Sequence, residues 1–155
     1  MSQRNDVLAE ILQQARATLE GNLDRVGAAD WPRPIAEDGW TIRDVLAHLA
    51  YNQPSRAQLV RGILAGKGGA PADFDLDRFN ARGVAKQQER SVAELRAILA
   101  AGHVDTLALL AGLTDADLDR KGNDPACGAV TVAEIFHLTA YHDLQHARQI
   151  RDALE

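Results

Sequence analysis

The sequence predicts an all-α protein, a four-helix bundle, and three observations support this fold class. Apolar residues recur at three- and four-residue steps in four long stretches, whereas the alternation expected of strands is almost absent. A serine or threonine followed three residues later by an acidic residue, the capping-box pattern, opens three of these stretches. Loops rich in proline and glycine separate them. Four amphipathic helices joined by loops pack well as a bundle around one core.

The bulk properties indicate one soluble globular domain spanning residues 1–155. A net charge of −5 without a basic block argues against nucleic acid or an anionic membrane as the main partner. No apolar run approaches the roughly 20 residues of a membrane span, and no signal sequence is visible, so we expect a cytoplasmic protein. A single cysteine, Cys127, excludes an internal disulfide and a cysteine-based zinc site.

The first half of the chain contains two predicted long helices. Apolar periodicity places the first helix over residues 6–28. Two prolines and a glycine in residues 31–39 should break the helical pattern. Thr41 is well placed as the N-cap of the second helix, which should end at the glycine-rich residues 66–69. Pro54 falls inside this helix and should kink it, because an interior proline costs roughly 3 kcal/mol.

The second half begins with a shorter polar helix, predicted over residues 75–89. Ser91 opens a further amphipathic helix through a capping box. Residues 113–118 are expected to form a turn or a single helical turn, and residues 121–128 a loop. Thr131 opens the last helix, which should run to the end of the chain.

Three of the five histidines are expected to face the interior of the bundle. His142 and His146 are four residues apart, so they lie on one face of the last helix. At 100° per residue they fall at the edge of and within its apolar stripe, whereas His137 lies off that face and should be exposed. His48 flanks apolar residues of the second helix. It should therefore also lie at or near the interior.

Two interpretations of these histidines remain open on spacing alone. A pair four residues apart arises readily by chance, and an inward histidine is usually a core residue whose hydrogen bonds are satisfied. Three inward imidazoles are harder to accommodate, since an unpaired buried polar group costs roughly 1–3 kcal/mol. A divalent metal shared by His48, His142 and His146 would satisfy all three rings.

Two motifs carry a resemblance to a known family. Residues 39–49 read GWTIRDVLAHL, and residues 142–150 read HDLQHARQI. They resemble the start of the metal-binding helix and the closing helix of the DinB-like superfamily of damage-inducible metalloproteins. Residues 77–80, DRFN, are similar to a family signature between them. The resemblance spans nearly the whole chain, in the right order.

The resemblance implies an up-down-down-up bundle with a metal held by three side chains. Carried over to this sequence, the ligands are His48, His142 and His146. The superfamily includes the N-terminal domain of mycothiol-dependent maleylpyruvate isomerase, which has a carboxylate at the position of His142 and an additional C-terminal domain. Because this sequence has a histidine there and shows no such domain, the isomerase reaction itself is not inferred.

Three neutral imidazoles and an open position are typical of a catalytic zinc site. The undiminished +2 charge favours hydroxide or a thiolate as a fourth ligand. Zinc is expected first, with nickel, cobalt or iron as alternatives. Asp44, Asn52 and Asp143 could accept hydrogen bonds from the second ring nitrogens. A helix cap for Asp44 and surface polar groups for the other two are the more ordinary interpretation. We expect Cys127 to be incidental, and Trp40 and Phe79 to be core anchors.

The leading functional hypothesis is a metal-dependent transferase that binds a low-molecular-weight thiol as thiolate and adds it to a small electrophile. The first alternative is a metal-hydroxide hydrolase on the same site. The second is a non-catalytic metal-binding stress-response protein, with a blocked fourth position and a homodimer interface. The expected partners are thus a small-molecule thiol or electrophile, with a homodimer as an option, and neither nucleic acid nor a membrane.

Overall fold

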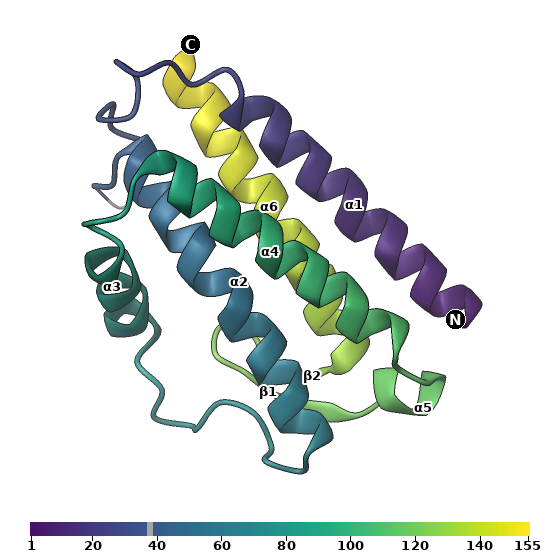
Figure 1. The fold of residues 1–155 in the computed structure, drawn as a ribbon. Helices are drawn as coiled ribbons and strands as arrows, with labels where there is room; N and C mark the ends of the chain where they lie inside the picture. The colour runs from purple at the N-terminus through teal and green to yellow at the C-terminus, as the bar shows by residue number, and fades with distance from the viewer. Residues whose placement is uncertain (37–38) are drawn as a thin grey trace.

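The computed structural model describes residues 1–36 and 39–155, in which four long helices pack side by side (Figure 1). The elements in chain order are α1 (Gln3–Leu23), α2 (Ile42–Leu64), α3 (Leu76–Lys86), α4 (Val92–Ala111), α5 (Asp115–Leu118), β1 (Lys121–Asp124), β2 (Gly128–Thr131) and α6 (Val132–Leu154). Among the described residues no helix is long and apolar enough to cross a membrane. The predicted all-α bundle is confirmed.

The four long helices follow an up-down-down-up order, as predicted. In Figure 1, α1 and α6 run in one direction, and α2 and α4 run in the other. The connection from α2 to α4, which includes α3, carries the chain back along the bundle so that α4 can run parallel to α2. Helix α6 packs against both α1 and α2. The two helices that carry the three histidines are therefore neighbours.

The predicted helix starts at Thr41, Ser91 and Thr131 are confirmed. Each of these side chains accepts a hydrogen bond from the backbone N–H three residues later, and the acidic residue there accepts from the N–H of the cap. Thr114 forms a further capping box, which opens α5. A cap of this kind stabilises a helix by about 1 kcal/mol, so the starts of these helices are encoded locally.

Three boundaries differ from the predictions. Helix α1 spans Gln3–Leu23 rather than residues 6–28. It starts earlier because the Ser2 hydroxyl caps it by accepting from the N–H of Asn5, and after Leu23 the N–H groups of Arg25 and Val26 bond to carbonyls three residues back, as in turns. Helix α3 ends at Lys86 instead of at residue 89. Pro54 lies inside α2, as predicted, and the kink expected there stays a prediction.

The predicted break between the first two helices is present. The described part of residues 31–39 is not helical. Glu37 and Asp38 lie outside the described residues. A backbone bridge between Pro34 and Thr41 closes this connection. It places Thr41 directly at the start of α2, so the break ends where the capping box begins.

The prediction of a loop over residues 121–128 was wrong, since most of this segment forms a β-hairpin. In the antiparallel pair β1–β2, Lys121 lies opposite Thr131 and Asp124 opposite Gly128. An Asp124 carboxylate oxygen, Oδ1, accepts from the N–H groups of the two residues before Gly128, each at 2.9 Å. Gly128 has a φ of 74°, a conformation that favours glycine. Strands of four residues without apolar alternation leave no periodic signal.

A polar layer crosses the middle of the bundle, between two clusters of buried apolar side chains. Its centre is Arg16 of α1, only 6% exposed. Its guanidinium donates to the Asp143 carboxylate of α6 (Nε to Oδ2, 2.9 Å), to the Gln53 side-chain oxygen of α2 (2.9 Å) and to the Leu99 carbonyl of α4 (3.0 Å). Arg16 thus links all four long helices.

The partner carboxylate, Asp143, is 2% exposed, so its interpretation as a surface group was wrong. Burial raises the pKa of Asp143, and the neighbouring Arg16 guanidinium opposes that rise. The Gln53 amide continues the layer by donating to the hydroxyl of Thr106 at 2.8 Å. This hydroxyl donates in turn to the carbonyl of Gly102 at 2.9 Å. The buried polar groups of the layer therefore satisfy one another.

The replacement Arg16→Met should lower the free energy of unfolding by about 3–5 kcal/mol, because it leaves the Asp143 carboxylate buried without its cation. Urea denaturation of the purified protein measures this. The matched control is Arg4→Met on the same helix, which removes the exposed Arg4–Asp119 ion pair and should cost less than about 1 kcal/mol. Equal losses in the two variants would show that the polar layer contributes no special stability.

Candidate metal centre

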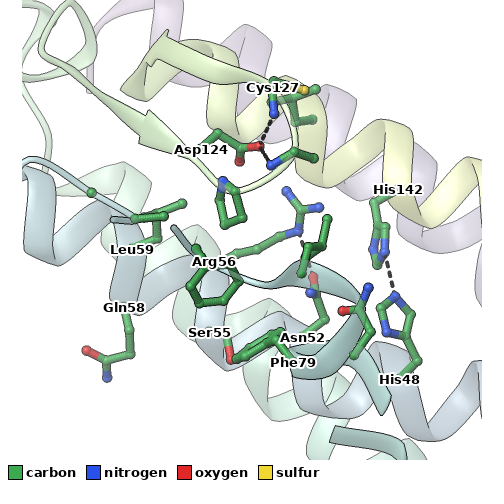
Figure 2. Close-up of a pocket in the computed structure, with 18 of the residues that line it drawn as sticks. His48, Asn52, Ser55, Arg56, Gln58, Leu59, Phe79, Asp124, Cys127 and His142 are labelled. Atoms are coloured by element: carbon green, nitrogen blue, oxygen red, sulfur yellow. Dashed lines mark hydrogen bonds between the residues drawn. The ribbon is translucent and has the colours of Figure 1, made fainter. Parts of the chain in front are cut away.

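The structure brings together the three histidines that the sequence singled out. His48 projects from α2, while His142 and His146 project from adjacent turns of α6. The Nε2 atom of His142 lies 2.9 Å from that of His48 and 3.1 Å from that of His146. Figure 2 shows His48 and His142 pointing toward each other from the two helices. The three rings form a cluster that could hold a metal ion.

Burial keeps two rings of this cluster, those of His48 and His142, in the neutral form that binds metals. His48 and His146 are 5% and 6% exposed, and His142 is half-buried. Burial, reinforced by the neighbouring His146, lowers the pKa of His48 to about 3. The same causes, in the same order, lower the pKa of His142 well below its ordinary value. These two imidazoles therefore present lone pairs rather than charges at neutral pH. His137, as predicted, is exposed.

The hydrogen atoms and lone pairs available on the three rings favour a cation between them. The side-chain oxygen of Gln149 lies 2.7 Å from Nδ1 of His146. With that oxygen as acceptor, Nδ1 carries the ring hydrogen, and the lone pair of His146 is on Nε2. Both short Nε2 contacts involve His142, whose one Nε2 hydrogen can point to one neighbour. A cation among the three nitrogens accommodates all three lone pairs at once.

The spacing of the nitrogens also fits a divalent metal. Zinc–nitrogen distances of about 2.0–2.1 Å in a tetrahedral site place nitrogen ligands about 3.3 Å apart. The observed separations of 2.9 and 3.1 Å need only a small outward movement of the rings. An all-imidazole set suits zinc, nickel, cobalt or iron. The residues present therefore fit the metal that the sequence predicted, and metal binding itself stays a prediction.

A cavity of about 630 Å³ opens beside the histidines. Its wall is formed by α2, α3, α6 and the hairpin turn, and Figure 2 shows part of it. The large apolar side chains of this wall are Trp40, Leu59, Phe74, Leu76, Phe79, Leu138 and Tyr141. The ring of Trp40 packs 5.0 Å from that of His48, at 45°. Trp40 and Phe79, expected only as core anchors, thus also line the space next to the candidate metal.

The three residues expected as possible acceptors for the second ring nitrogens, Asp44, Asn52 and Asp143, form other contacts instead. Asp44 belongs to the helix cap, as expected. Asn52 is 8% exposed, so it is not a surface group, and its side-chain oxygen accepts from Arg56 at 2.7 Å. Asp143 pairs with Arg16.

Sequence reasoning missed Gln149 as the partner of a ligand ring. Its side-chain oxygen contacts Nδ1 of His146 at 2.7 Å, and the residue is 8% exposed. A signal was present, since a residue three positions after His146 lies on the same side of a helix. A second-nitrogen partner of this kind fixes the ring orientation and raises the basicity of the ligand.

The fold and the site together define a helical-bundle protein with a candidate three-histidine metal centre. The family model of the DinB superfamily matches residues 11–150. The chain therefore belongs to the DinB superfamily. A comparison with curated protein sequences finds no match.

Solved structures share this fold at low sequence identity. Mycothiol-dependent maleylpyruvate isomerase superposes with a TM-score of 0.80 and 14% identity, over 97% of this chain and 63% of the isomerase. YfiT from Bacillus subtilis, described as a probable metal-dependent hydrolase with an unusual four-helix bundle topology, gives a TM-score of 0.76 and 22% identity, over 99% of this chain and 87% of YfiT. The four-helix bundle protein TT2238 gives a TM-score of 0.69 and 19% identity, over 96% of this chain and 98% of TT2238. The chain thus spans less than two thirds of the isomerase.

Replacing a predicted ligand, or the residue that orients it, tests the metal site directly. We expect His146→Ala to lose tight zinc binding, and Gln149→Ala to weaken it by about 10–100-fold, because that side chain orients the His146 ring. Competition with a chromophoric zinc chelator measures both. The control, His137→Ala, removes an exposed histidine of the same helix and should bind zinc like the wild type. Zinc binding by His146→Ala at wild-type affinity would contradict the assigned ligands.

Proposed function

We propose that this protein is a metal-dependent transferase that uses a low-molecular-weight thiol, with the metal held by His48, His142 and His146. The observation that carries the proposal is the convergence of three imidazole nitrogens at the wall of a largely apolar cavity of about 630 Å³. A site of this form has ligands for a metal and space for a small reactant beside them. Zinc is the metal we propose first.

Each part of the site has a task in this proposal. A divalent ion held by three neutral ligands keeps its full charge and favours the thiolate form of a bound thiol. The imidazoles of His48 and His142 stay neutral because they are buried. Gln149 orients the ring of His146. The apolar wall, including Trp40 and Phe79, holds a small electrophile next to the histidines and excludes water from it.

A hydrolase on the same site is the second candidate. The likeness to YfiT, described as a probable metal-dependent hydrolase, supports it, and the likeness to the mycothiol-dependent isomerase supports the transferase. In the hydrolase, water takes the place of the thiol, and the chain uses the same three ligands. The two functions therefore differ in one property, the requirement for an added thiol.

The non-catalytic alternative requires that the fourth coordination position of the metal be blocked. The cavity beside His48 argues against it, because small molecules have access to the histidines there. The proposed partners are accordingly a small thiol and a small electrophile, and a homodimer is not required. We also propose a cytoplasmic location, since thiols are kept reduced there.

Zinc-loaded protein should accelerate the reaction of a thiol with the chromogenic electrophile 1-chloro-2,4-dinitrobenzene. Mycothiol, bacillithiol and glutathione are tested in turn, and absorbance reports the thioether. His48→Ala should lower the rate at least about 100-fold, because several kcal/mol of charge stabilisation are lost with the metal. His137→Ala is the control and should keep the wild-type rate. Cleavage of 4-nitrophenyl acetate without any thiol, together with no thiol transfer, would favour the hydrolase instead.

A further inference from the structure

The cavity contains an arginine, Arg56, that the proposed metal chemistry does not use. It lies on α2 eight residues after His48, and Asn52 lies between them, so the three side chains share one face of the helix. The side chain is half-buried. Within residues 1–36 and 39–155, no carboxylate oxygen lies within 4.0 Å of its guanidinium. Arg56 is thus a partly buried cation without an ion-pair partner in the described part of the chain.

The orientation of Arg56 is fixed by one hydrogen bond. Its Nε donates to the side-chain oxygen of Asn52 at 2.7 Å. Figure 2 shows the side chain reaching into the cavity, with His142 on one side and the turn that carries Asp124 and Cys127 on another. The nearby carboxylate of Asp124 accepts two backbone N–H groups of its own turn at Oδ1, and within residues 1–36 and 39–155 it forms no hydrogen bond or ion pair with Arg56. The two terminal nitrogens of Arg56 therefore keep their donors for another acceptor.

Electrostatics favours an anion at this place. Burial lowers the pKa of Arg56, with the charges of Asp124, Asp143 and Cys127 opposing that shift. Arginine nevertheless stays protonated at neutral pH. A purely structural role, as a support for Asn52, uses one of the five N–H donors of a guanidinium. The remaining donors and the positive charge are what a bound anion would use.

A second polar group in the cavity wall also lacks a partner. The side-chain oxygen of Asn80, on α3, is buried and forms no hydrogen bond. Arg56 and Asn80 lie on different helices that both line the cavity, and most of the remaining wall is apolar. A small ligand with an apolar body and an anionic group complements this wall.

We propose that the cavity binds a small carboxylate through the terminal nitrogens of Arg56. The planar fork of a guanidinium matches the two oxygens of a carboxylate. The other cationic side chain of the cavity wall, Lys67, is exposed, so Arg56 is the better shielded of the two for pairing with an anionic group. The inference rests on the proposed function in treating this cavity as the substrate site. It assigns the substrate class, a small carboxylate, that the transferase would act on or carry.

Binding of benzoate and of its neutral isostere benzamide tests the proposal. Both are titrated into the full-length protein with zinc bound and again after treatment with EDTA, and two-dimensional NMR reports the affinities. The EDTA-treated protein decides, since bound zinc would itself attract a carboxylate: there the wild type should prefer benzoate at least about tenfold, because only benzoate supplies a charge for Arg56. Arg56→Met should abolish the preference. The control Lys67→Met, which removes the exposed cation, should change it less than about twofold.

Three outcomes overturn the proposal: no preference in the wild type, a preference kept in Arg56→Met, or tighter binding of inorganic phosphate than of benzoate. If Arg56→Met fails to fold, Arg56→Lys is tested in its place, since lysine keeps the positive charge but lacks the planar fork of the guanidinium. We expect this variant to bind benzoate about fivefold more weakly, and an unchanged affinity overturns the proposal. Thiol transfer without a benzoate preference contradicts this inference alone, whereas a benzoate preference without zinc binding contradicts only the proposed function.

Discussion

The buried guanidinium of Arg16 is the contact on which the arrangement of the bundle depends. It bonds to side chains or backbone of the three other long helices, through Asp143, Gln53 and the carbonyl of Leu99. Apolar packing on either side of this layer is strong but has no preferred direction, so it tolerates rotation and sliding of the helices. Hydrogen bonds have direction, and those of Arg16 select one rotation and one register for the helices that it joins.

The same contact orients the candidate metal centre. Asp143 directly follows His142 in the chain, and successive residues of a helix point about 100° apart. When Asp143 is turned toward Arg16, His142 and His146 are turned toward α2. On α2, Gln53 makes the corresponding contact with Arg16, while His48 faces the cavity. The three rings therefore converge because the polar layer holds two helices in place. The metal-binding geometry is built into the packing of the chain.

Local signals predicted the fold class, the capped helix starts and the inward histidines. The features that the sequence did not predict depend on side-chain contacts that form only in the folded protein. Asp143 was interpreted as a surface polar group and Arg16 was not singled out, although Arg16 lies four residues after Leu12 on the apolar stripe of α1, because a sequence does not show which charges meet. The hairpin was missed, since its turn depends on the Asp124 carboxylate rather than on an apolar pattern. The role of Gln149 needed the side-chain orientation that only the structure provides.

X-ray absorption spectroscopy of the zinc-loaded protein tests the central claim most directly, namely that His48, His142 and His146 hold a metal with one position open to the cavity. The account predicts a zinc spectrum with three imidazole ligands and one light atom. Addition of a thiol should replace that atom by sulfur at about 2.3 Å. A spectrum with fewer than three imidazoles, or with the same ligands before and after the thiol, would contradict it.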